Sequence, residues 1–240
     1  MKKTYVYGFL VLLGIIASYV IILFLLDPTK AISLTTEDGI TENLSVLCYF
    51  LSGCLFFYMF FKTKSTTGKY IFGTRRNYFF LILGVFCILI LGEEINWGQR
   101  ILEVDAPDWI AEKESGEMNL HNLDTLFTIF GIRINAARIY FPIVILFFMV
   151  IPILDKLSSK AERLFKKMSL PIVPITLAVL YLFNFILFRI FVGLDLPQGF
   201  SDISYPQTTM EVYEIDFAIL LLWNSIAFYL INKNETVAAH

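Results

Sequence analysis

Long apolar segments are the feature that most constrains how this chain can fold. Six stretches are long and apolar enough to cross a bilayer, which takes about 20 residues of helix, and nothing between them could form a separate soluble core. The chain has 57% hydrophobic residues and a mean hydropathy of +0.69, which is typical of integral membrane proteins. The predicted spans are approximately Tyr5–Leu26, Glu42–Phe61, Tyr78–Trp97, Ile134–Leu154, Leu170–Gly193 and Glu211–Ile231. We therefore expect an all-α integral membrane protein, with residues 1–240 forming a single six-helix transmembrane bundle.

The basic residues gather in two loops, which sets the expected orientation. The loop 62–77 carries Lys62, Lys64, Lys69, Arg75 and Arg76 without an acid. The loop 155–169 carries Lys156, Lys160, Arg163, Lys166 and Lys167. By the positive-inside rule both loops, and with them both termini, lie in the cytoplasm. Of the 21 acids, the ones expected on that side are Asp155, Glu162 and Glu235. Because topology already accounts for the basic loops, a nucleic-acid partner is not expected.

Two outer sequences match the capping box that starts a helix. Thr35–Asp38 and Thr208–Glu211 predict that the second and sixth helices begin there, near the outer surface. One face of the second helix carries a polar stripe of Glu42, Ser45, Tyr49 and Ser52. On the sixth helix Glu211 and Glu214 share a face. Polar stripes in membrane helices face the bundle interior or a wet cavity, so we expect these residues to point inward.

The stretch Gly92–Arg100 follows an apolar run and holds two adjacent carboxylates, Glu93 and Glu94. A charge at the centre of a membrane helix costs about 2.5–3.5 kcal/mol, so a chain that keeps two there normally uses them for binding or chemistry. Adjacent helical positions point about 100° apart, so both can face one cavity only if the helix ends there. Gly92 and Gly98 favour such an end.

The long outer segment 98–133 supplies further candidates. Residues 105–111 predict a short interfacial helix that begins at Pro107. Beyond it stand Asn119 and His121, and the other histidine of the chain is the terminal His240, so a three-histidine zinc site is impossible. His121 is a candidate metal ligand or general base. A structural hydrogen-bonding role is its alternative.

Together these groups predict a cation site at the outer face. Carboxylates with one imidazole suit a hard or borderline divalent cation, and the residue types do not distinguish Zn, Ca, Mg and Mn. The predicted metal ligands are Glu42, Glu94, Glu214 and His121. The predicted catalytic groups are Glu93, Glu94 and His121. In the alternative reading, the acids pair with arginines and only hold the outer ends of the helices together.

Three arginines at the outer mouth are exceptions to the charge pattern. Arg100 follows the glutamate pair, whereas Arg138 and Arg189 are expected in apolar surroundings, where they need partners. Arginine is suited to bidentate recognition of phosphate. We therefore expect these arginines, with Gln99 and Asn119, to bind a substrate, and salt bridges to nearby acids are the alternative.

The motif GEExxWGQ at Gly92–Gln99, followed by NLHN at 119–122, resembles a signature of uncharacterised bacterial multi-pass membrane proteins over most of the chain. This resemblance implies a bacterial cytoplasmic membrane protein and brings no activity. The glutamate pair is partly similar to CAAX-type intramembrane proteases, although Arg100 comes two residues later than theirs and His121 is the one histidine available for their two histidine motifs. Asp38, Glu42 and Asn43 are partly similar to the calcium motif of alkaline ceramidases, whose three zinc histidines this chain lacks.

These observations predict a polar cavity that opens to the extracytoplasmic side. We expect a metal-dependent hydrolase or transferase that acts on a lipid or a lipid-linked head group. The residues expected in the outer half carry the charge, whereas the stretches 86–91 and 217–222 carry none, which favours an enzyme over a small ion- or proton-coupled transporter. A third possibility is an accessory subunit that docks a partner through its acidic outer loops.

Overall fold

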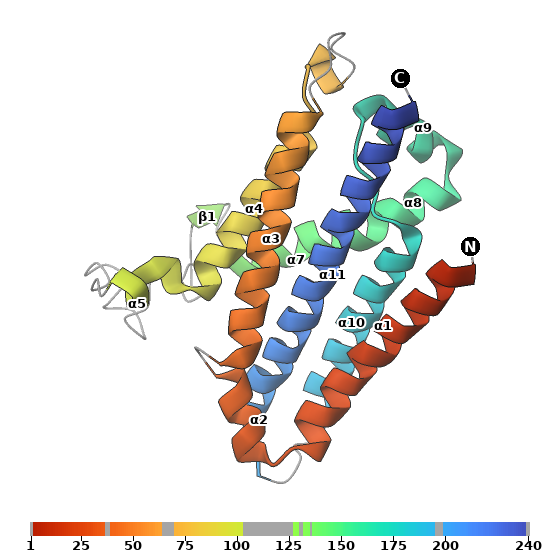
Figure 1. The fold of residues 1–240 in the computed structure, drawn as a ribbon. Helices are drawn as coiled ribbons and strands as arrows, with labels where there is room; N and C mark the ends of the chain where they lie inside the picture. The colour runs from red at the N-terminus through yellow and green to blue at the C-terminus, as the bar shows by residue number, and fades with distance from the viewer. Residues whose placement is uncertain are drawn as a thin grey trace.

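The computed structural model describes residues 2–36, 39–63, 70–102, 127–129, 132–134, 136–194 and 199–238. In this part of the chain the architecture is a bundle of helices (Figure 1), and five helical runs are long and apolar enough to cross a membrane. They are Tyr7–Leu25, Pro28–Lys62, Arg138–Leu157, Ile175–Val192 and Ser204–Asn232. The expected class, an all-α multi-pass membrane protein, is consistent with these apolar helices.

The elements of the first half are, in chain order, α1 (Lys2–Val20), η1 (Ile21–Leu25), α2 (Pro28–Thr35), α3 (Ile40–Lys62), η2 (Ile71–Gly73), α4 (Tyr78–Glu94), η3 (Asn96–Gly98) and α5 (Gln99–Leu102). The turn between η1 and α2 is made by Asp27, whose side chain accepts a hydrogen bond from the backbone N–H of Thr29 and caps α2. Hydrogen bonds from the Thr29 hydroxyl and backbone hold the pKa of the Asp27 carboxyl below its usual range.

The second half contains β1 (Phe127–Ile129), β2 (Ile132–Ile134), α7 (Ala136–Val144), η4 (Ile145–Val150), α8 (Ile151–Leu157), α9 (Ser159–Met168), α10 (Ile175–Val192) and α11 (Ser204–Ala238). Strands β1 and β2 pair antiparallel, with Thr128 opposite Arg133. The segment that we expected on the outer side therefore ends in a short antiparallel pair of strands, which the sequence did not lead us to expect. The predicted interfacial helix at 105–111 lies outside the described residues.

Helix α11 lies at the centre of the bundle, between α3 on one side and α1 and α10 on the other (Figure 1). Its residues Tyr213, Ala218, Leu220 and Leu221 are fully buried. Aromatic rings fill the space around it: the Tyr181 ring lies 4.8 Å from that of Phe148 and 5.3 Å from that of Phe217, between ring centroids. Since lipid is as apolar as the helices, such van der Waals packing holds a membrane bundle together.

Small residues let α3 and α4 approach closely. A Cβ atom built on Gly53 would lie 3.3 Å from Cβ of Cys87, and one on Gly84 would lie 3.0 Å from the Phe57 ring. The expected polar stripe of α3 faces inward, since Ser45, Tyr49 and Ser52 are buried. Its hydroxyls bond within the helix, as Ser52 Oγ donates to the carbonyl of Cys48 at 2.7 Å.

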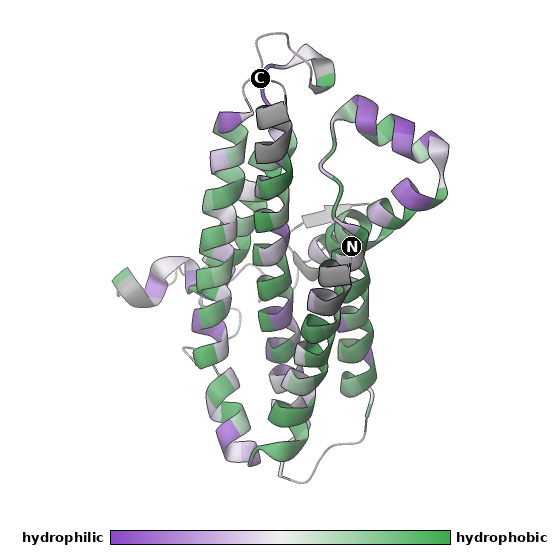
Figure 2. Ribbon diagram, turned by 45° about the vertical axis from the view of Figure 1, so that its right-hand side comes forward, coloured by the Kyte–Doolittle hydropathy of each residue, from purple (hydrophilic) through white to green (hydrophobic). Residues whose placement is uncertain are grey.

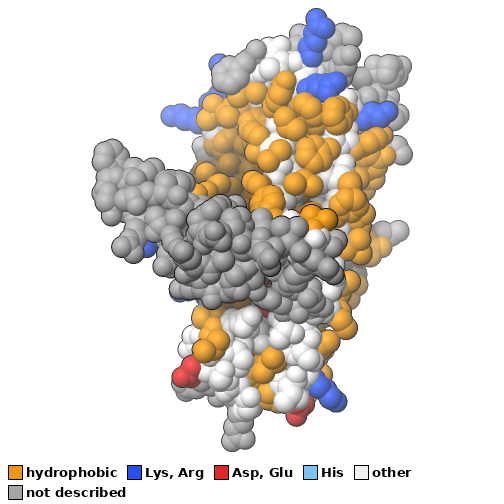
Figure 3. Space-filling model, turned by 90° about the vertical axis from the view of Figure 1, so that its left-hand side faces the viewer, with side chains coloured by type: hydrophobic (Ala, Val, Ile, Leu, Met, Phe, Trp, Pro, Cys, Tyr) orange, Lys and Arg blue, Asp and Glu red, His pale blue; other side chains and the backbone are white. Residues whose placement is uncertain are grey.

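Charge and hydropathy divide the molecule along its long axis. Figure 2 shows apolar residues along most of the helices and hydrophilic ones towards their ends. In Figure 3 most visible Lys and Arg side chains lie at the upper end, hydrophobic side chains cover the middle, and the visible acids lie at the lower end. The C-terminal end of α11 reaches the upper end, whereas α1 begins about midway along the bundle (Figure 1). The basic end and the opposite end are thus chemically distinct.

Three local predictions were wrong. Thr35 ends α2 and Thr208 lies inside α11, so neither begins a helix; instead their hydroxyls contact each other at 3.1 Å. The start of α11 is capped by Ser201 and Ser204, whose backbone N–H groups donate to each other's side chains. The basic segment 155–169, expected to be a loop, contains helix α9.

Candidate functional site

Helix α4 ends at the glutamate pair, as we predicted from Gly92 and Gly98 on either side of it. Asn96, Trp97 and Gly98 all adopt positive φ, at 48°, 52° and 79°, which turns the chain out of the helix. Figure 1 shows α4 and α5 leaving the bundle part-way along α3 and α11. With 17 residues, α4 is shorter than the roughly 20 residues that span a bilayer. The predicted third span therefore ends early, inside the length of the bundle.

The turn at the end of α4 gives the two carboxylates different surroundings. The Trp97 ring folds back over Gly92, where an added Cβ would lie 2.9 Å from ring atoms. Its indole Nε1 donates to Oε1 of Glu93 at 2.7 Å, which holds Glu93 at the turn. Adjacent helical positions diverge by about 100°, and Glu94 interacts instead with acids of α3 and α11.

Four half-buried carboxylates converge beside the end of α4. Glu94 interacts electrostatically with Glu42 of α3 and Glu211 of α11, and Glu214 of α11 interacts with all three. We call Glu42, Glu94, Glu211 and Glu214 the acidic cluster. Like charges in a medium of low dielectric constant repel strongly, so a group of this kind calls for protons, a cation or cationic side chains.

Tyrosines from three helices line the acidic cluster. The side chains of Tyr49 on α3 and Tyr140 on α7 interact electrostatically with Glu94 and Glu214, and Tyr213 on α11 interacts with Glu214. The Tyr213 hydroxyl is fully buried and has no hydrogen-bond partner among the described residues. Buried polar atoms nearly always have a partner. The side of the cluster that Tyr213 faces is therefore suited to a small polar ligand, an ion or water.

A second buried polar group lies between α1, α10 and α11. Oδ2 of Asp216 lies 2.7 Å from the donor Ser18 Oγ. Tyr19 donates its hydroxyl to Oδ1 of Asn184 at 3.1 Å, and Nδ2 of Asn184 donates to the carbonyl of Tyr213 at 3.1 Å. All except Ser18 are buried. Sequence reasoning missed this group, although a lone Asp inside the apolar stretch of α11 was a visible signal.

The structure brings together only some of the predicted site residues. Glu42, Glu94 and Glu214 share the acidic cluster, with Glu93 beside it. Gln99 is half-buried in α5, after the turn. Arg138 in α7 and Arg189 in the last turn of α10 are both exposed on the surface of the bundle, so the apolar surroundings expected for them remain a prediction. Three predicted positions lie outside what the structure describes, namely the Arg100 side chain, Asn119 and His121.

The described side chains do not by themselves complete a metal site. Within the described ranges, no group of three or more His, Cys, Asp or Glu side chains is arranged to hold a metal ion. The predicted imidazole ligand, His121, belongs to the segment 103–126, which lies outside those ranges.

Comparison with known proteins adds no assignment to this geometry. No family model matches the chain, and no curated protein and no solved structure matches it either.

Proposed function

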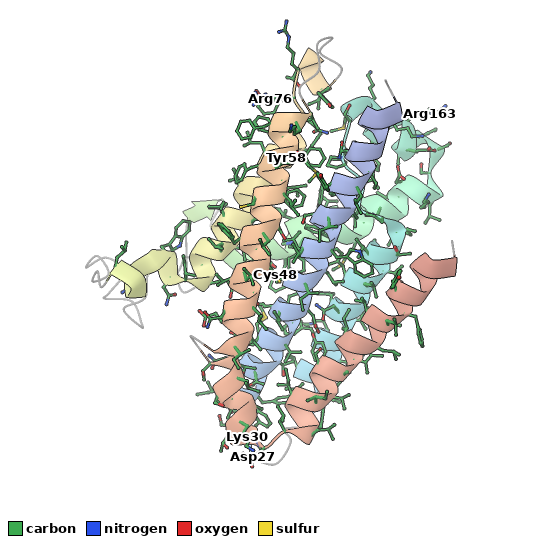
Figure 4. The ribbon with its side chains drawn as sticks, in the orientation of Figure 1. Asp27, Lys30, Cys48, Tyr58, Arg76 and Arg163 are labelled. Carbon is green, nitrogen blue, oxygen red and sulfur yellow. The ribbon has the colours of Figure 1, made fainter. Side chains whose placement is uncertain are left out.

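We propose that the chain is an integral membrane protein of six transmembrane helices. The short helix α4, third of the six in chain order, would be a span in addition to the five long apolar runs. The basic end of the bundle would face the cytoplasm. The positive-inside rule supports this orientation, because Arg76 and Arg163 lie at one end of the bundle and Asp27 lies with Lys30 at the other (Figure 4). Both termini would then be cytoplasmic, and the acidic cluster would lie toward the extracytoplasmic side of the membrane.

We propose further that the acidic cluster binds a divalent cation and that the protein is a hydrolase or transferase acting on a lipid or lipid-linked head group. One observation carries this proposal: four carboxylates from three helices converge next to the buried hydroxyl of Tyr213, which has no hydrogen-bond partner among the described residues. A divalent cation would relieve the repulsion among the carboxylates and take oxygen ligands from them. It would also polarise a phosphoryl or carbonyl group of a substrate.

The roles follow from chemistry and position. Glu42, Glu94 and Glu214 would supply carboxylate ligands, and His121 would complete the set or act as a general base. Glu93, held by Trp97, would act on the reacting group from beside the cation. The groups proposed to hold a phosphate-bearing head group are Arg100, Arg138, Arg189, Gln99 and Asn119.

Metal content and thermal stability test the cation site. Purified protein should contain about one equivalent of divalent metal, and at 100 times the dissociation constant a single bound ion should stabilise it by about 2.7 kcal/mol. Glu94→Gln and Glu214→Gln should lose both the metal and the stabilisation. Glu162→Gln is the matched control, since Glu162 is an exposed helical glutamate near the basic end that pairs with Lys166. Protein without metal, with a melting temperature indifferent to EDTA and to added Ca²⁺, Mn²⁺ or Zn²⁺, would contradict the proposal.

Ion-coupled transport is the second candidate, and one observation favours it. Buried polar side chains continue along α11 beyond the acidic cluster, from Asp216 to Asn224, whose amide atoms have no hydrogen-bond partner among the described residues. Transporters place polar groups along the path of their ions. A cation flux in proteoliposomes that contain the purified protein, absent from protein-free liposomes, would favour transport over catalysis.

A further inference from the structure

Helix α9 is amphipathic and lies at the edge of the bundle. Ser158 caps it by accepting a hydrogen bond from the backbone N–H of Ala161 at 3.3 Å, and it ends at Ser169, with φ of 54°. At 100° per residue, one face carries Ala161, Leu164, Phe165 and Met168. The opposite face carries Lys160, Arg163, Lys166 and Lys167. No residue of α9 is buried. Its basic face is exposed, and on the apolar face Leu164 is exposed while the others are half-buried.

The position of α9 is fixed by contacts at its C-terminal end. Nδ2 of Asn77 donates to the carbonyl of Ser169 at 2.9 Å, while Oδ1 of the same side chain accepts from the backbone N–H of Phe79 and caps α4. The backbone N–H of Leu170 donates to the carbonyl of Phe165 at 3.0 Å and closes the helix end. One buried asparagine thus ties α9 to the start of α4.

Neighbouring basic residues mark the level of a membrane surface. The Arg76 guanidinium lies over the rings of Phe60 and Phe61, at 5.2 and 5.0 Å from their centroids, and Lys62 lies over the ring of Tyr58 at 5.6 Å. Basic side chains over aromatic rings at helix ends are typical of the head-group region. Figure 4 shows Arg76 and Arg163 at the same end of the bundle, opposite Asp27 and Lys30. Helix α9 therefore lies near this level.

The charges on α9 are unevenly balanced. Glu162 accepts a hydrogen bond from Lys166 at 2.6 Å. This bond holds the pKa of the Glu162 carboxyl below its usual range and raises that of Lys166, so both stay ionised and largely neutralise each other. Lys160, Arg163 and Lys167 are exposed and form no salt bridge with another described residue. Three cations thus remain for an external partner.

We infer that α9 lies in the membrane surface, with its apolar face among the acyl chains and its basic face binding the head groups of anionic phospholipids. Leu164 is 53% exposed and Leu157, just before the helix, is 80% exposed, so apolar contacts are available at the same depth as the charges. Positive charge beside an exposed apolar stripe matches an anionic lipid surface, which offers negative charge above hydrocarbon. The surface is separate from the acidic cluster and does not depend on its function.

Lipid binding to the whole purified protein tests this inference. Native mass spectrometry of the detergent-solubilised chain should show phosphatidylglycerol bound in preference to phosphatidylcholine. Replacing all four basic residues, by Lys160→Gln, Arg163→Gln, Lys166→Gln and Lys167→Gln together, should lower that preference about tenfold or more. The matched control keeps the charge through Lys160→Arg, Lys166→Arg and Lys167→Arg, and should keep the preference.

A second measurement covers the case in which the variant with all four glutamine substitutions, called the neutral variant, does not fold. The phosphatidylglycerol preference of the wild-type protein should fall as the salt concentration rises from roughly 0.05 to 0.5 M, because ions screen exposed charges. A preference that is unchanged in the neutral variant, insensitive to salt, or absent from the wild type would overturn the inference. Equal loss of both lipids in the neutral variant would also overturn it, since charge would then not be the basis of binding.

Discussion

At the scale of single residues, the contact between Tyr19 and Asn184 is the clearest polar link across the bundle. Tyr19 donates to Asn184 Oδ1 at 3.1 Å, its ring stacks on that of Phe191 with centroids 5.0 Å apart, and both polar side chains are fully buried. Hydrogen bonds between membrane helices contribute about 0.6 kcal/mol on average and up to about 2 kcal/mol. This pair therefore helps to fix α1 against α10.

A double-mutant cycle should measure that contribution. Tyr19→Phe keeps the stacked ring and removes only the hydroxyl. Asn184→Leu leaves that hydroxyl with only the backbone carbonyl of residue 184, at 3.5 Å, and also removes the donor to the Tyr213 carbonyl, so it should cost more, about 1–3 kcal/mol. The double variant should be more stable than the sum of the two losses predicts, by about 1 kcal/mol, because both partners are then apolar. Thermal or denaturant unfolding in detergent provides the measurement. Strict additivity would show that the hydroxyl and the amide do not interact in solution.

Some site residues could be predicted from the sequence and others could not, for a physical reason. Glu42, Glu94 and Glu214 were predictable because helical spacing or a helix end directs a charge inward, and their convergence supports that reasoning. Asn184 was not, since it is a single polar residue in an apolar run, and Asp216 was overlooked because it does not share a helical face with Glu214, two residues before it. Their partners come from α1 and α11, more than one hundred residues away for Asp216, and such contacts leave no spacing pattern.

At the scale of the element, the end of α4 depends on the packing of Trp97 against Gly92. In an ordinary helix Gly→Ala stabilises by up to about 1 kcal/mol. At Gly92 an added methyl group would meet the Trp97 ring at 2.9 Å, and overpacking of this kind costs about 1–3 kcal/mol. The Glu93 side chain, bonded to Trp97, would then lose its anchor.

Gly92→Ala should therefore lower the melting temperature of the detergent-solubilised protein by about 2–4 °C. Gly14→Ala is the matched control, because nothing lies within 4 Å of the added methyl group in α1, and it should be neutral or slightly stabilising. The combination Gly92→Ala with Trp97→Ala should regain part of the loss by making room for the methyl group. If Gly92→Ala melts at the wild-type temperature, the Trp97 contact does not determine where α4 ends.

Element identities were predictable and element ends were not. Hydropathy located helices because a span must satisfy its backbone hydrogen bonds internally, and five helical runs are long and apolar enough to cross a membrane within the described residues. The ends of helices depend on contacts between residues that are distant in the sequence. For example, the Thr35 side chain contacts that of Thr208 instead of capping α3. The basic segment 155–169 was expected to be a loop between two spans, yet it contains α9, which has an amphipathic period and a serine cap.

At the scale of the whole molecule, charge separation predicts how the bundle lies in the membrane. Arg76 and Arg163 lie at one end, and Asp27 lies with Lys30 at the other (Figure 4). Positive charge is retained on the cytoplasmic side during insertion, so the basic end should be inside. The acidic cluster would then be reached from outside, where the proposed lipid head groups of the outer leaflet are found.

Cysteine labelling in intact cells and in inverted membranes tests this orientation. In a background in which Cys48, Cys54 and Cys87 are replaced by serine, Ser159→Cys at the start of α9 and Thr66→Cys in the first basic loop should react with an impermeant maleimide only in inverted membranes. Ser33→Cys in α2, which is exposed at the opposite end, and Gly116→Cys should react in intact cells; Thr66 and Gly116 lie outside the described residues. Labelling of Ser33→Cys only in inverted membranes would show that the orientation is the reverse of the proposed one. That result would place the acidic cluster on the cytoplasmic side and rule out an outer-leaflet substrate. If all four positions are labelled as expected, the acidic cluster is accessible to lipid head groups from outside.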